Sequence, residues 1–389
     1  MKKILCAGQI GCGKFANYQD LPNLTNHDEV NLKWVCDVNI ENAKSAAAKF
    51  NVPCCTSDYM DIINDPEVDF IKIATTHEVH LPIIDAAAKA GKHVFCEKPM
   101  AMNNEEAYKI IRAVRRGNIK ICVDLNRRMS PAMQALKAKY LAHAANPAHN
   151  PWRYIEKVRE PLPEENLPHL NIRIQDESSS YGLGHLDPLS GGGEIIGESV
   201  HWLDLACWLF APQLPIEITA WGSSRLSHGI YLKFDKGASM TLDFSCSGTF
   251  DYPKEIFELT DNAALFRSLF FVENNYYGMP DNQPETFKLQ HDPLPEMGDG
   301  FDAYNKKYFS HVSGSTNAKE LENTVPLMVD KGHFAMLDGF VKAIINDTQS
   351  PCDEMAGFRS TYLAQLAIES IRKRQTIPVC IEDITPCII

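Results

Sequence analysis

The first 125 residues alternate short apolar runs with longer segments that are amphipathic or rich in alanine. The longer segments, which read as helices, are 41–50, 80–91 and 104–117. The apolar runs before, between and after them are 4–7, 32–38, 68–75, 93–97 and 119–125. Strands that alternate with helices of about 10 to 15 residues indicate βαβ units, so this part of the chain is predicted to form a parallel sheet.

The pattern changes after residue 126. A predicted helix at 132–143 leads into a proline-rich stretch, 145–190, that has no clear period. A long irregular stretch inside a compact domain is either disordered or functional, and its aromatic and histidine side chains favour a functional loop.

The remainder of the chain predicts strands and then helices. Two hairpin turns are expected, at Lys236-Gly237 and at Asn262-Ala263. The predicted antiparallel strands are 216–222, 229–235, 238–246, 255–261 and 264–272, and the closing helices are 332–346 and 358–374.

Composition narrows the class of protein. The 389 residues suffice for two domains, and 44% hydrophobic and 23% charged residues are ordinary for a globular chain. A formal charge of −12 argues against nucleic acid or an anionic membrane surface as the partner. The apolar run at the start ends at Gly8, too soon for a secretory signal, and no run is long enough to span a membrane.

The cysteines indicate a reduced, cytoplasmic protein. The 12 cysteines are spread along the chain, and several, such as Cys6 and Cys36, lie in apolar strand-like runs. Cysteines placed in this way are usually small buried residues with reduced thiols. Because no set of cysteines and histidines has the spacing of a zinc site, we expect no metal.

A glycine-rich turn follows the first apolar run. The first glycine of a G-x-G-x-x-A turn allows a tight bend, the second lets a pyrophosphate approach a helix N-terminus, and the small third residue allows close packing. Asp37 ends the second strand, near the spacing of the acid that binds the adenosine ribose. A carboxylate there would repel a 2′-phosphate, so we expect NAD rather than NADP. The turn consists of Gly11, Cys12, Gly13, Lys14, Phe15 and Ala16.

Polar side chains follow the third main strand. Thr75, Thr76 and His77 are expected to face the crevice at the carboxyl ends of the strands, and His80 to begin the next helix. The alternative is a polar N-cap cluster with a structural role, and for Thr76 both interpretations stay open.

The segment 191–210 opens with three glycines and continues as a predicted helix. Glu198 and His201 are three residues apart and therefore share one face of that helix. A lone histidine on an apolar helix is usually a core residue, but the neighbouring carboxylate and the glycine run favour a functional pair. A Glu-x-x-His di-metal site competes with this interpretation, yet such a site needs a second copy that the sequence lacks.

A carboxylate and an ammonium directly follow a predicted buried strand. Val94 and Phe95 end the strand, and Glu97, Lys98 and Pro99 come next. This is either a solvated turn with proline at the entry of a helix or a site at the carboxyl end of a parallel sheet, where α/β proteins place their chemistry.

Together these segments resemble the glucose-fructose oxidoreductase / inositol dehydrogenase / MocA family over essentially the whole chain. The resemblance implies a Rossmann NAD-binding domain at 1–125 and, at 126–389, a substrate-binding and oligomerisation domain with an open, mainly antiparallel sheet. In the family this sheet often forms the oligomer interface, so a homo-oligomer, dimer or tetramer, is expected. The matching pieces are GCGKFA, CDVN, KIATTHEVHLPIIDAAAKAGKHVFCEKPMA, NRRMSPAM, GGGEIIGESVHWLDLACWL and GHFAMLDGFVKAI.

The resemblance also implies roles for single residues. Lys98 is expected to reach both the nicotinamide ribose and the reacting hydroxyl, and Glu97 to lie on the cofactor side. Asn126 would contact cofactor or substrate, and Arg127 would border the substrate pocket. His201 is the candidate for proton transfer together with Lys98. Lys98 itself is suited to exchanging a proton, because a positive nicotinamide ring beside a lysine disfavours its charged form.

One position departs from the common family pattern. Many relatives carry an aspartate four residues before the histidine, where this chain has Gly197. The acid here is Glu198, three residues before His201, and a subset of relatives has this G-E-x-x-H form. Glu198 is therefore interpreted as the substitute partner.

The family acts on sugars, cyclitols and glycosides, and usually oxidises a ring secondary alcohol with NAD. The length of 145–190 suggests a glycoside, oxidised at C3 of its pyranoside ring. Two alternatives stay open: an NAD-dependent glycoside hydrolase that works by transient oxidation and elimination, and a non-catalytic sugar or NAD sensor. The candidate substrate-binding residues are Lys98, Arg127, Tyr154, Arg173, Tyr181, His185, Glu198 and His201.

Overall fold

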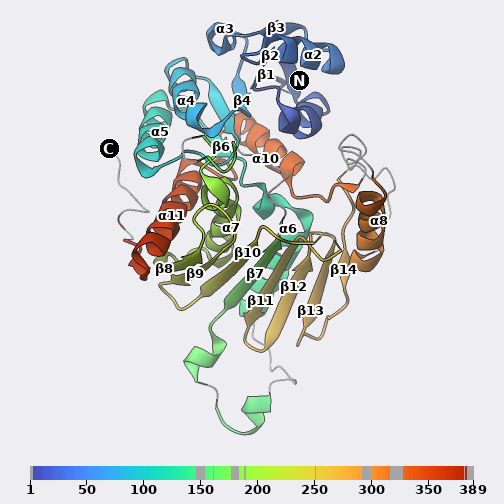
Figure 1. Cartoon of the computed structure of the whole chain (residues 1–389), viewed down its shortest axis with the longest axis vertical. Coiled ribbons are helices and arrows are strands. Elements are labelled where there is room, and N and C mark those ends of the chain that lie inside the picture. Colours follow the sequence, from blue (N-terminus) through green and yellow to red (C-terminus); the bar gives the residue numbers. More distant parts are fainter. Residues whose placement is uncertain are drawn as a thin grey trace.

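The structure is a computed structural model that contains two sheets, one of six and one of nine strands in the described part of the chain (Figure 1). Within that part, none of the helices has the length and apolar character needed to cross a membrane. The described residues are 3–145, 154–160, 162–176, 184–187, 190–249, 251–290, 300–315, 327–380 and 382.

The first sheet is parallel throughout, and its strands lie in the order β3-β2-β1-β4-β5-β6. Because the strand order reverses between β1 and β4, their carboxyl ends form the switch point at which open α/β sheets bind ligands. The predicted parallel sheet is confirmed. Its strands are β1 (Leu5–Ile10), β2 (Val30–Cys36), β3 (Cys54–Thr56), β4 (Phe70–Ile73), β5 (His93–Cys96) and β6 (Ile121–Val123).

Polar caps begin the longer helices of this sheet. Asn39 accepts a hydrogen bond from the Glu41 backbone N–H before α2, and Asn103 accepts one from the Glu106 N–H before α5. The helices are α1 (Leu21–Thr25), which follows the π-helical segment η1 (Ala16–Asp20), and then α2 (Ile40–Phe50), α3 (Tyr59–Asn64), α4 (His80–Lys89) and α5 (Asn104–Gly117).

The second sheet is mixed but mainly antiparallel, as predicted. Its order is β14-β13-β12-β11-β7-β10-β9-β8-β15, and among these neighbours only β7 and β10 run parallel. The strands are β7 (His169–Gln175), β8 (Pro215–Gly222), β9 (His228–Phe234), β10 (Ser239–Ser245), β11 (Glu255–Asp261), β12 (Ala264–Leu269), β13 (Glu273–Tyr277), β14 (Glu285–Thr286) and β15 (Ile377–Pro378).

Strand β7 corrects the prediction of an irregular loop over 145–190. Residues 169–175 form a strand near the middle of the second sheet, between β10 and β11. Ile172 and Ile174 are buried, whereas Asn171 and Arg173 are exposed on the other face. This period of two residues is the mark of a strand with one solvated face, and the prolines and glycines around it obscure it in the sequence.

Two predicted hairpin turns are confirmed and one predicted strand is too long. Gly237, Asn262 and Ala263 all adopt positive φ between neighbouring strands. The run 264–272, predicted as one strand, instead turns at Phe270 and Phe271, whose φ values are +46° and +61°. A two-residue turn with both φ positive matches the twist of a hairpin, so the chain folds back into β13 there.

The helices after β6 pack on both sheets. α6 (Pro131–Ala145), α7 (Val200–Phe210) and α11 (Glu354–Lys373) cover one face of the second sheet, and α8 (Phe301–Gly314) lies near its β14 edge (Figure 1). α10 (His333–Ile345) instead packs on the first sheet, where the ring of Phe340 lies 5.7 Å from that of Phe70 and 5.5 Å from that of Phe95. A late segment of the chain thus completes the layer beside the switch point.

Candidate active site

The glycine turn after β1 lies at the switch point. Gly11 has φ +94°, and a Cβ there would lie 2.2 Å from the Ala74 carbonyl oxygen, so only glycine permits this approach. A Cβ on Gly13 would meet no atom within 4 Å, so the space in front of the second glycine is open. Both features suit a pyrophosphate that binds close to the backbone.

The other four residues of the turn divide between core and surface. Cys12 and Ala16 are buried, Lys14 is exposed, and Phe15 is half-buried with its ring 5.7 Å from that of His333. Burial raises the pKa of the Cys12 thiol to about 12, so this thiol stays protonated at neutral pH. The turn therefore offers backbone N–H groups and a small packing residue rather than a reactive group.

Asp37 is held beside the turn by backbone donors. Its Oδ2 accepts from the Cys12 N–H over 2.9 Å, and its Oδ1 accepts from the Asn39 N–H over 2.9 Å. The carboxylate is half-exposed, and the neighbouring Val38 is 94% exposed. A fixed negative charge here fits the ribose hydroxyls of NAD and would repel a 2′-phosphate, so the residues present fit the cofactor.

The polar residues after β4 do not all face the same way. Thr75 is half-buried, and Thr76 is exposed at the N-cap of the short helix η2 (His77–Val79) without a capping side-chain bond. His77 Nδ1 lies 3.2 Å from the carbonyl oxygen of Gly191, which links the switch point to the loop before α7. His80 is fully buried, and its Nδ1 lies 3.0 Å from the Pro99 carbonyl oxygen. The His80 ring therefore supports the turn that follows β5 and contains Pro99.

Burial keeps both of these histidines neutral. It lowers the pKa of His77 to about 3, with smaller effects from His80 and Lys98, and lowers the pKa of His80 to about 4. Neither ring is therefore a proton carrier near neutral pH.

The Glu97 carboxylate points into a buried cluster of charged side chains. Lys72, 2% exposed, lies 2.5 Å from Glu97, 3.3 Å from Asp20 and 3.6 Å from Asp124. The three carboxylates are close enough to hold a metal ion, but the Lys72 ammonium already lies among them. Burial raises the pKa of Glu97 well above its usual value despite Lys72, so this carboxyl group retains a proton more readily than an exposed one. Its side chain anchors the turn that carries Lys98.

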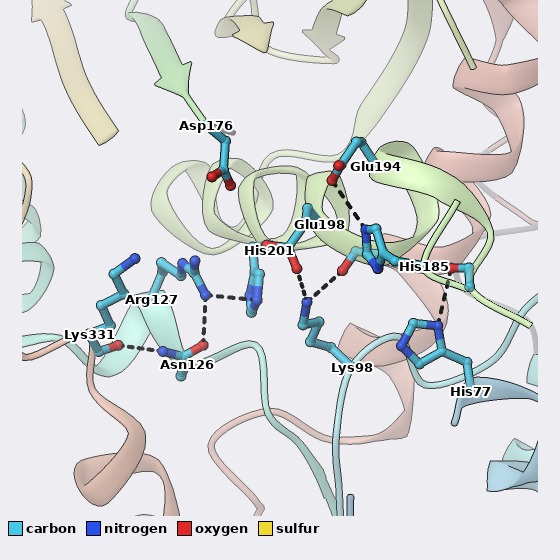
Figure 2. Close-up of polar contacts among 12 residues, drawn as sticks. His77, Lys98, Asn126, Arg127, Asp176, His185, Glu194, Glu198, His201 and Lys331 are labelled. Atoms are coloured by element: carbon cyan, nitrogen blue, oxygen red, sulfur yellow. Dashed lines mark hydrogen bonds and ion pairs between the residues drawn. The ribbon is translucent and has the colours of Figure 1, made fainter. Parts of the chain in front are cut away.

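Lys98 reaches across to the segment before α7. Its Nζ donates to the Gly197 carbonyl oxygen over 2.6 Å and also contacts the Glu198 carboxylate (Figure 2). The Lys98–Pro99 peptide bond is cis. Gly197 and Glu198 belong to the π-helical segment η7 (Ile195–Ser199), and such segments are frequent at functional sites.

Glu198 is a permanent carboxylate. Its burial alone would raise its pKa, but Lys98 and Arg127 outweigh this effect and lower the pKa to about 2. The Lys98 and Glu198 side chains are only 18% and 8% exposed. A shielded ammonium–carboxylate pair therefore lies at the edge of the parallel sheet that the carboxyl ends of its strands form.

His201 is paired with an arginine rather than with an acid. Its Nε2 accepts a hydrogen bond from Arg127 Nη1 over 2.7 Å, as Figure 2 shows. Burial and then the charges of Arg127 and Lys98 lower the pKa of His201 well below its usual value. With Nε2 accepting, the proton of the neutral ring lies on Nδ1, for which the described residues offer no partner.

A fully buried carboxylate holds Arg127 in place. Glu255, at the start of β11, lies 3.2 Å from Arg127 Nη2, accepts from Lys331 over 2.5 Å, and accepts from Trp202 Nε1 over 3.1 Å. Burial lowers the pKa of Lys331 to about 8. Asn126 donates to the Lys331 carbonyl oxygen over 2.8 Å and accepts from Arg127 over 3.1 Å, so it joins the two basic residues.

Four residues within 145–190 are predicted from the sequence to bind the substrate, and the structure does not place them all in the site. His185 lies in the site, with its Nε2 3.2 Å from the Glu194 carboxylate (Figure 2). Arg173 does not: it projects from β7 on the face opposite the helices, 3.7 Å from Asp243, so its assignment to the substrate site is wrong. Tyr181 and the side chain of Tyr154 lie outside the described residues.

The sequence did not indicate the residues that hold the predicted site residues in place. Lys72, Glu255, Lys331 and His333 come from three separate parts of the chain, and the sequence assigns no role to any of them. A charged residue inside an apolar strand, as Lys72 is within β4, is the one signal that the sequence offers, because an unpaired charge there would be costly. The folded chain gives it three carboxylate partners.

Comparison with known proteins gives a consistent picture. Residues 6–125 match the oxidoreductase family with an NAD-binding Rossmann fold. An uncharacterized oxidoreductase of Bacillus subtilis is 26% identical over 69% of this chain and 75% of its own length. Levoglucosan dehydrogenase of Pseudarthrobacter phenanthrenivorans is 42% identical, but over only 29% of each chain. Myo-inositol 2-dehydrogenase of Thermotoga maritima is 23% identical over 86% of this chain and 93% of its own.

Solved structures resemble the whole chain. Levoglucosan dehydrogenase in complex with NADH and levoglucosan matches with a TM-score of 0.73 and 20% identity, over 97% of this chain and 100% of that one. At this identity the match shows a shared fold that includes both sheets.

Proposed function

Because this chain belongs to the glucose-fructose oxidoreductase / inositol dehydrogenase / MocA family, we propose that it oxidises a ring secondary alcohol of a sugar, glycoside or cyclitol. The observation that carries the proposal is the shielded pair of Lys98, which follows β5, and Glu198, at the ligand-binding edge of the parallel sheet. A sensor has no need of a buried proton-transfer pair there. Relatives named as levoglucosan, myo-inositol and D-apiose dehydrogenases support this substrate class.

The proposed cofactor site is the turn Gly11 to Ala16 together with Asp37. The backbone around Gly13 would bind the pyrophosphate, and Asp37 would bind the adenosine ribose. Thr75, Thr76 and His77 would lie along the nicotinamide side. Bound NAD⁺ supplies the hydride acceptor.

Lys98, positioned by Glu198, is proposed to remove the hydroxyl proton. Lys98 first releases one ammonium proton to water, and its free amine then takes the proton of the alcohol as the carbon loses its hydride. The charge balance is kept because one proton leaves the site for each alcohol oxidised. The low pKa of Glu198 keeps this side chain a carboxylate, so it holds Lys98 in place and does not carry the proton.

His201 is proposed to bind the substrate oxygen. Its Nε2 lone pair accepts from Arg127, and its pKa lies well below the usual value, so it is a poor base at neutral pH. Its Nδ1–H remains available to a hydroxyl or carbonyl oxygen. Burial, and then the charge of Arg127, which Glu255 holds, keep the imidazole neutral. His185 lies in the same site, against Glu194.

We also propose that the position oxidised is C3 of a pyranoside.

The working form that we propose is a cytoplasmic homo-oligomer, a dimer or a tetramer. None of the cysteines in the described part of the chain forms a disulfide, which supports a reducing compartment. The outer face of the second sheet, with Trp221 53% exposed on β8, is the surface that we assign to the interface.

The test is to incubate the purified protein with NAD⁺ and a panel of sugars, inositols and aryl glycosides, and to follow NADH absorbance and products together. NADH formed in equal amount with a keto sugar would support the proposal. Release of the aglycone without accumulation of NADH would overturn it in favour of an NAD-dependent glycoside hydrolase.

A further inference from the structure

His333, the first residue of α10, lies between the parallel sheet and the residues that surround His201. Its Nδ1 lies 3.3 Å from Asp124 Oδ2, and its Nε2 lies 3.1 Å from Asn126 Nδ2. Its ring also contacts the glycine turn after β1, where the Phe15 ring lies edge-on at 5.7 Å. The proposed reaction gives this histidine no role, yet its contacts reach both the glycine turn and the candidate site.

A glycine lets the segment before α10 approach the segment that follows β6. Gly332 has φ +89°, and a Cβ there would lie 2.4 Å from the Ser130 backbone nitrogen and 2.6 Å from the Asn126 carbonyl oxygen. Any side chain at this position would therefore push the two segments apart. The contact between His333 and Asn126 depends on this close approach.

The Asn126 side-chain amide is oriented by two groups that can each act in only one way. The Lys331 carbonyl oxygen can only accept, so it faces Asn126 Nδ2, over 2.8 Å. The Arg127 guanidinium can only donate, so it faces Asn126 Oδ1, over 3.1 Å. Both contacts require the same orientation of the amide, and the second N–H of Nδ2 is then the group that faces His333.

This amide orientation in turn fixes the protons of the His333 ring. Because Nε2 faces an N–H group, it has to accept and carries no proton. The proton of the ring then lies on Nδ1, where the Asp124 carboxylate accepts a hydrogen bond from it. Asp124 is only 2% exposed and lies 3.6 Å from the Lys72 ammonium, so this carboxylate is itself held in place.

On the side of the candidate site, Asn126 and His201 share one nitrogen of Arg127. Arg127 Nη1 donates to Asn126 Oδ1 over 3.1 Å and to His201 Nε2 over 2.7 Å (Figure 2). The guanidinium is planar, so an acceptor on one N–H of Nη1 fixes the direction of the other N–H. Together with Glu255, the Asn126 amide therefore sets how the guanidinium meets the His201 ring.

We infer that His333 is a positioning residue of the reaction and that it acts on His201 through the Asn126 amide. The inference rests on the proposed function, in which the His201 Nδ1–H binds the substrate oxygen. Asp124 orients the His333 ring, and the ring fixes the second N–H of Asn126. The amide in turn aligns Arg127 against His201, which is then held in one tautomer and one orientation toward the reacting oxygen.

The test uses two variants of His333 that differ in what they keep. His333→Phe keeps a ring against Phe15 and removes both nitrogens, whereas the amide of His333→Gln still offers one acceptor and one donor. We expect kcat on a sugar that the native protein oxidises to fall about five- to tenfold in His333→Phe, the effect of roughly one net hydrogen bond. KM for NAD⁺ should stay nearly unchanged, and His333→Gln should recover most of the lost kcat.

His143→Phe on α6 is the matched control. His143 also makes one hydrogen bond, with the Asp261 carbonyl oxygen, and one edge contact, with the Phe266 ring at 5.8 Å. Its replacement should change the stability without lowering kcat. The route through the amide is tested in an Asn126→Ala background, where His333→Phe should cause little further loss of kcat, because both changes remove the same connection.

Three results would overturn the inference: an unchanged kcat in His333→Phe, equal losses in the phenylalanine and glutamine variants, or a full further loss in the Asn126→Ala background.

If the native protein oxidises no sugar, glycoside or inositol, the proposed function fails by itself, and nitrogen NMR of the full chain labelled with ¹⁵N-histidine decides separately. The spectrum of His201→Gln assigns the His201 signals. A neutral His201 ring with a bare Nε2 in the native protein and a mixture of tautomers in His333→Phe would support the positioning of His201 by His333. Identical His201 signals in the two proteins would overturn it.

Discussion

The ring of His185 occupies the space that a side chain at position 197 would need. A Cβ built on Gly197 would lie 2.3 Å from His185 Cε1 and 2.9 Å from Nε2. The resemblance described above places the acid of the common family pattern at this position. A side chain at position 197 would therefore force the His185 ring to move, and the acid that pairs with Lys98 in this chain is Glu198, in the π-helical segment η7.

Gly197→Asp should therefore damage the protein, and removal of the histidine ring should repair it. The single variant forces a displacement in a packed site and is expected to lose about 1–3 kcal/mol of unfolding free energy. The double variant Gly197→Asp/His185→Ala should recover most of that loss in urea unfolding, with His185→Ala alone as the control. Equal stability of the single and double variants would contradict the steric explanation.

Lys98→Met should abolish turnover but leave NAD binding. If Lys98 takes the hydroxyl proton, kcat should fall about 10²- to 10⁴-fold. The affinity for NAD⁺, measured by the quenching of protein fluorescence, should change little, because the pyrophosphate and adenosine contacts are elsewhere. Lys109→Met on the exposed face of α5 is the control. Retained turnover in Lys98→Met would remove this residue from the mechanism.

Asp37 should decide between NAD and NADP. The double variant Asp37→Ser/Val38→Arg removes the charge that repels a 2′-phosphate and adds a cation at a site that is 94% exposed. We expect its ratio of kcat/KM for NADP⁺ over NAD⁺ to rise at least about tenfold, which is a change of about 1.4 kcal/mol. Val38→Arg alone should shift the ratio less. An unchanged ratio would mean that Asp37 does not face the adenosine ribose.

The buried neutral histidines should make the protein less stable in acid. His77, His80 and His201 have folded pKa values below the usual 6.5, so below that pH the unfolded chain binds protons that the folded chain does not. Their contribution to stability is complete above pH 6.5 and declines as the pH falls toward about 4. Each histidine adds at most about 1.4 kcal/mol per pH unit to this slope.

Urea unfolding between pH 7 and pH 5 measures this slope. His77→Gln should reduce it, because glutamine does not titrate in either state. A slope that is the same in the native protein and in His77→Gln would show that the His77 ring takes up its proton in the folded state.

Lys72→Met should destabilise the protein strongly at neutral pH. It removes the cation that lies among three buried carboxylates, a change that typically costs about 3–5 kcal/mol. The loss should shrink in mildly acidic solution, because burial raises the pKa of Glu97 and of Asp20, and both can then be neutral. Lys109→Met, at an exposed ion pair, should change the unfolding free energy by less than about 1 kcal/mol.

The sequence by itself determined the parallel sheet, the glycine turn after its first strand and the place of Lys98 at the ligand-binding edge. These features are local: apolar runs with helical segments between them form βαβ units, the glycines permit a turn next to Ala74, and Lys98 follows a strand that must end at the ligand-binding edge. The same local rules predicted the turns at Lys236-Gly237 and Asn262-Ala263. They failed at Phe270 and Phe271, where tertiary packing of the rings overrides the preference of the turn.

Only the tertiary structure decided which partners surround the candidate site residues. Lys72 meets carboxylates from the end of η1 and from the residues that follow β5 and β6. Arg127 meets Glu255 and His201 from segments more than 70 residues away. No local pattern encodes such pairs, because their electrostatic energy depends on distances through space and on burial. The placement of Arg173 on the outer face, of β7 in the middle of the sheet and of His185 against Gly197 follows from the same long-range packing.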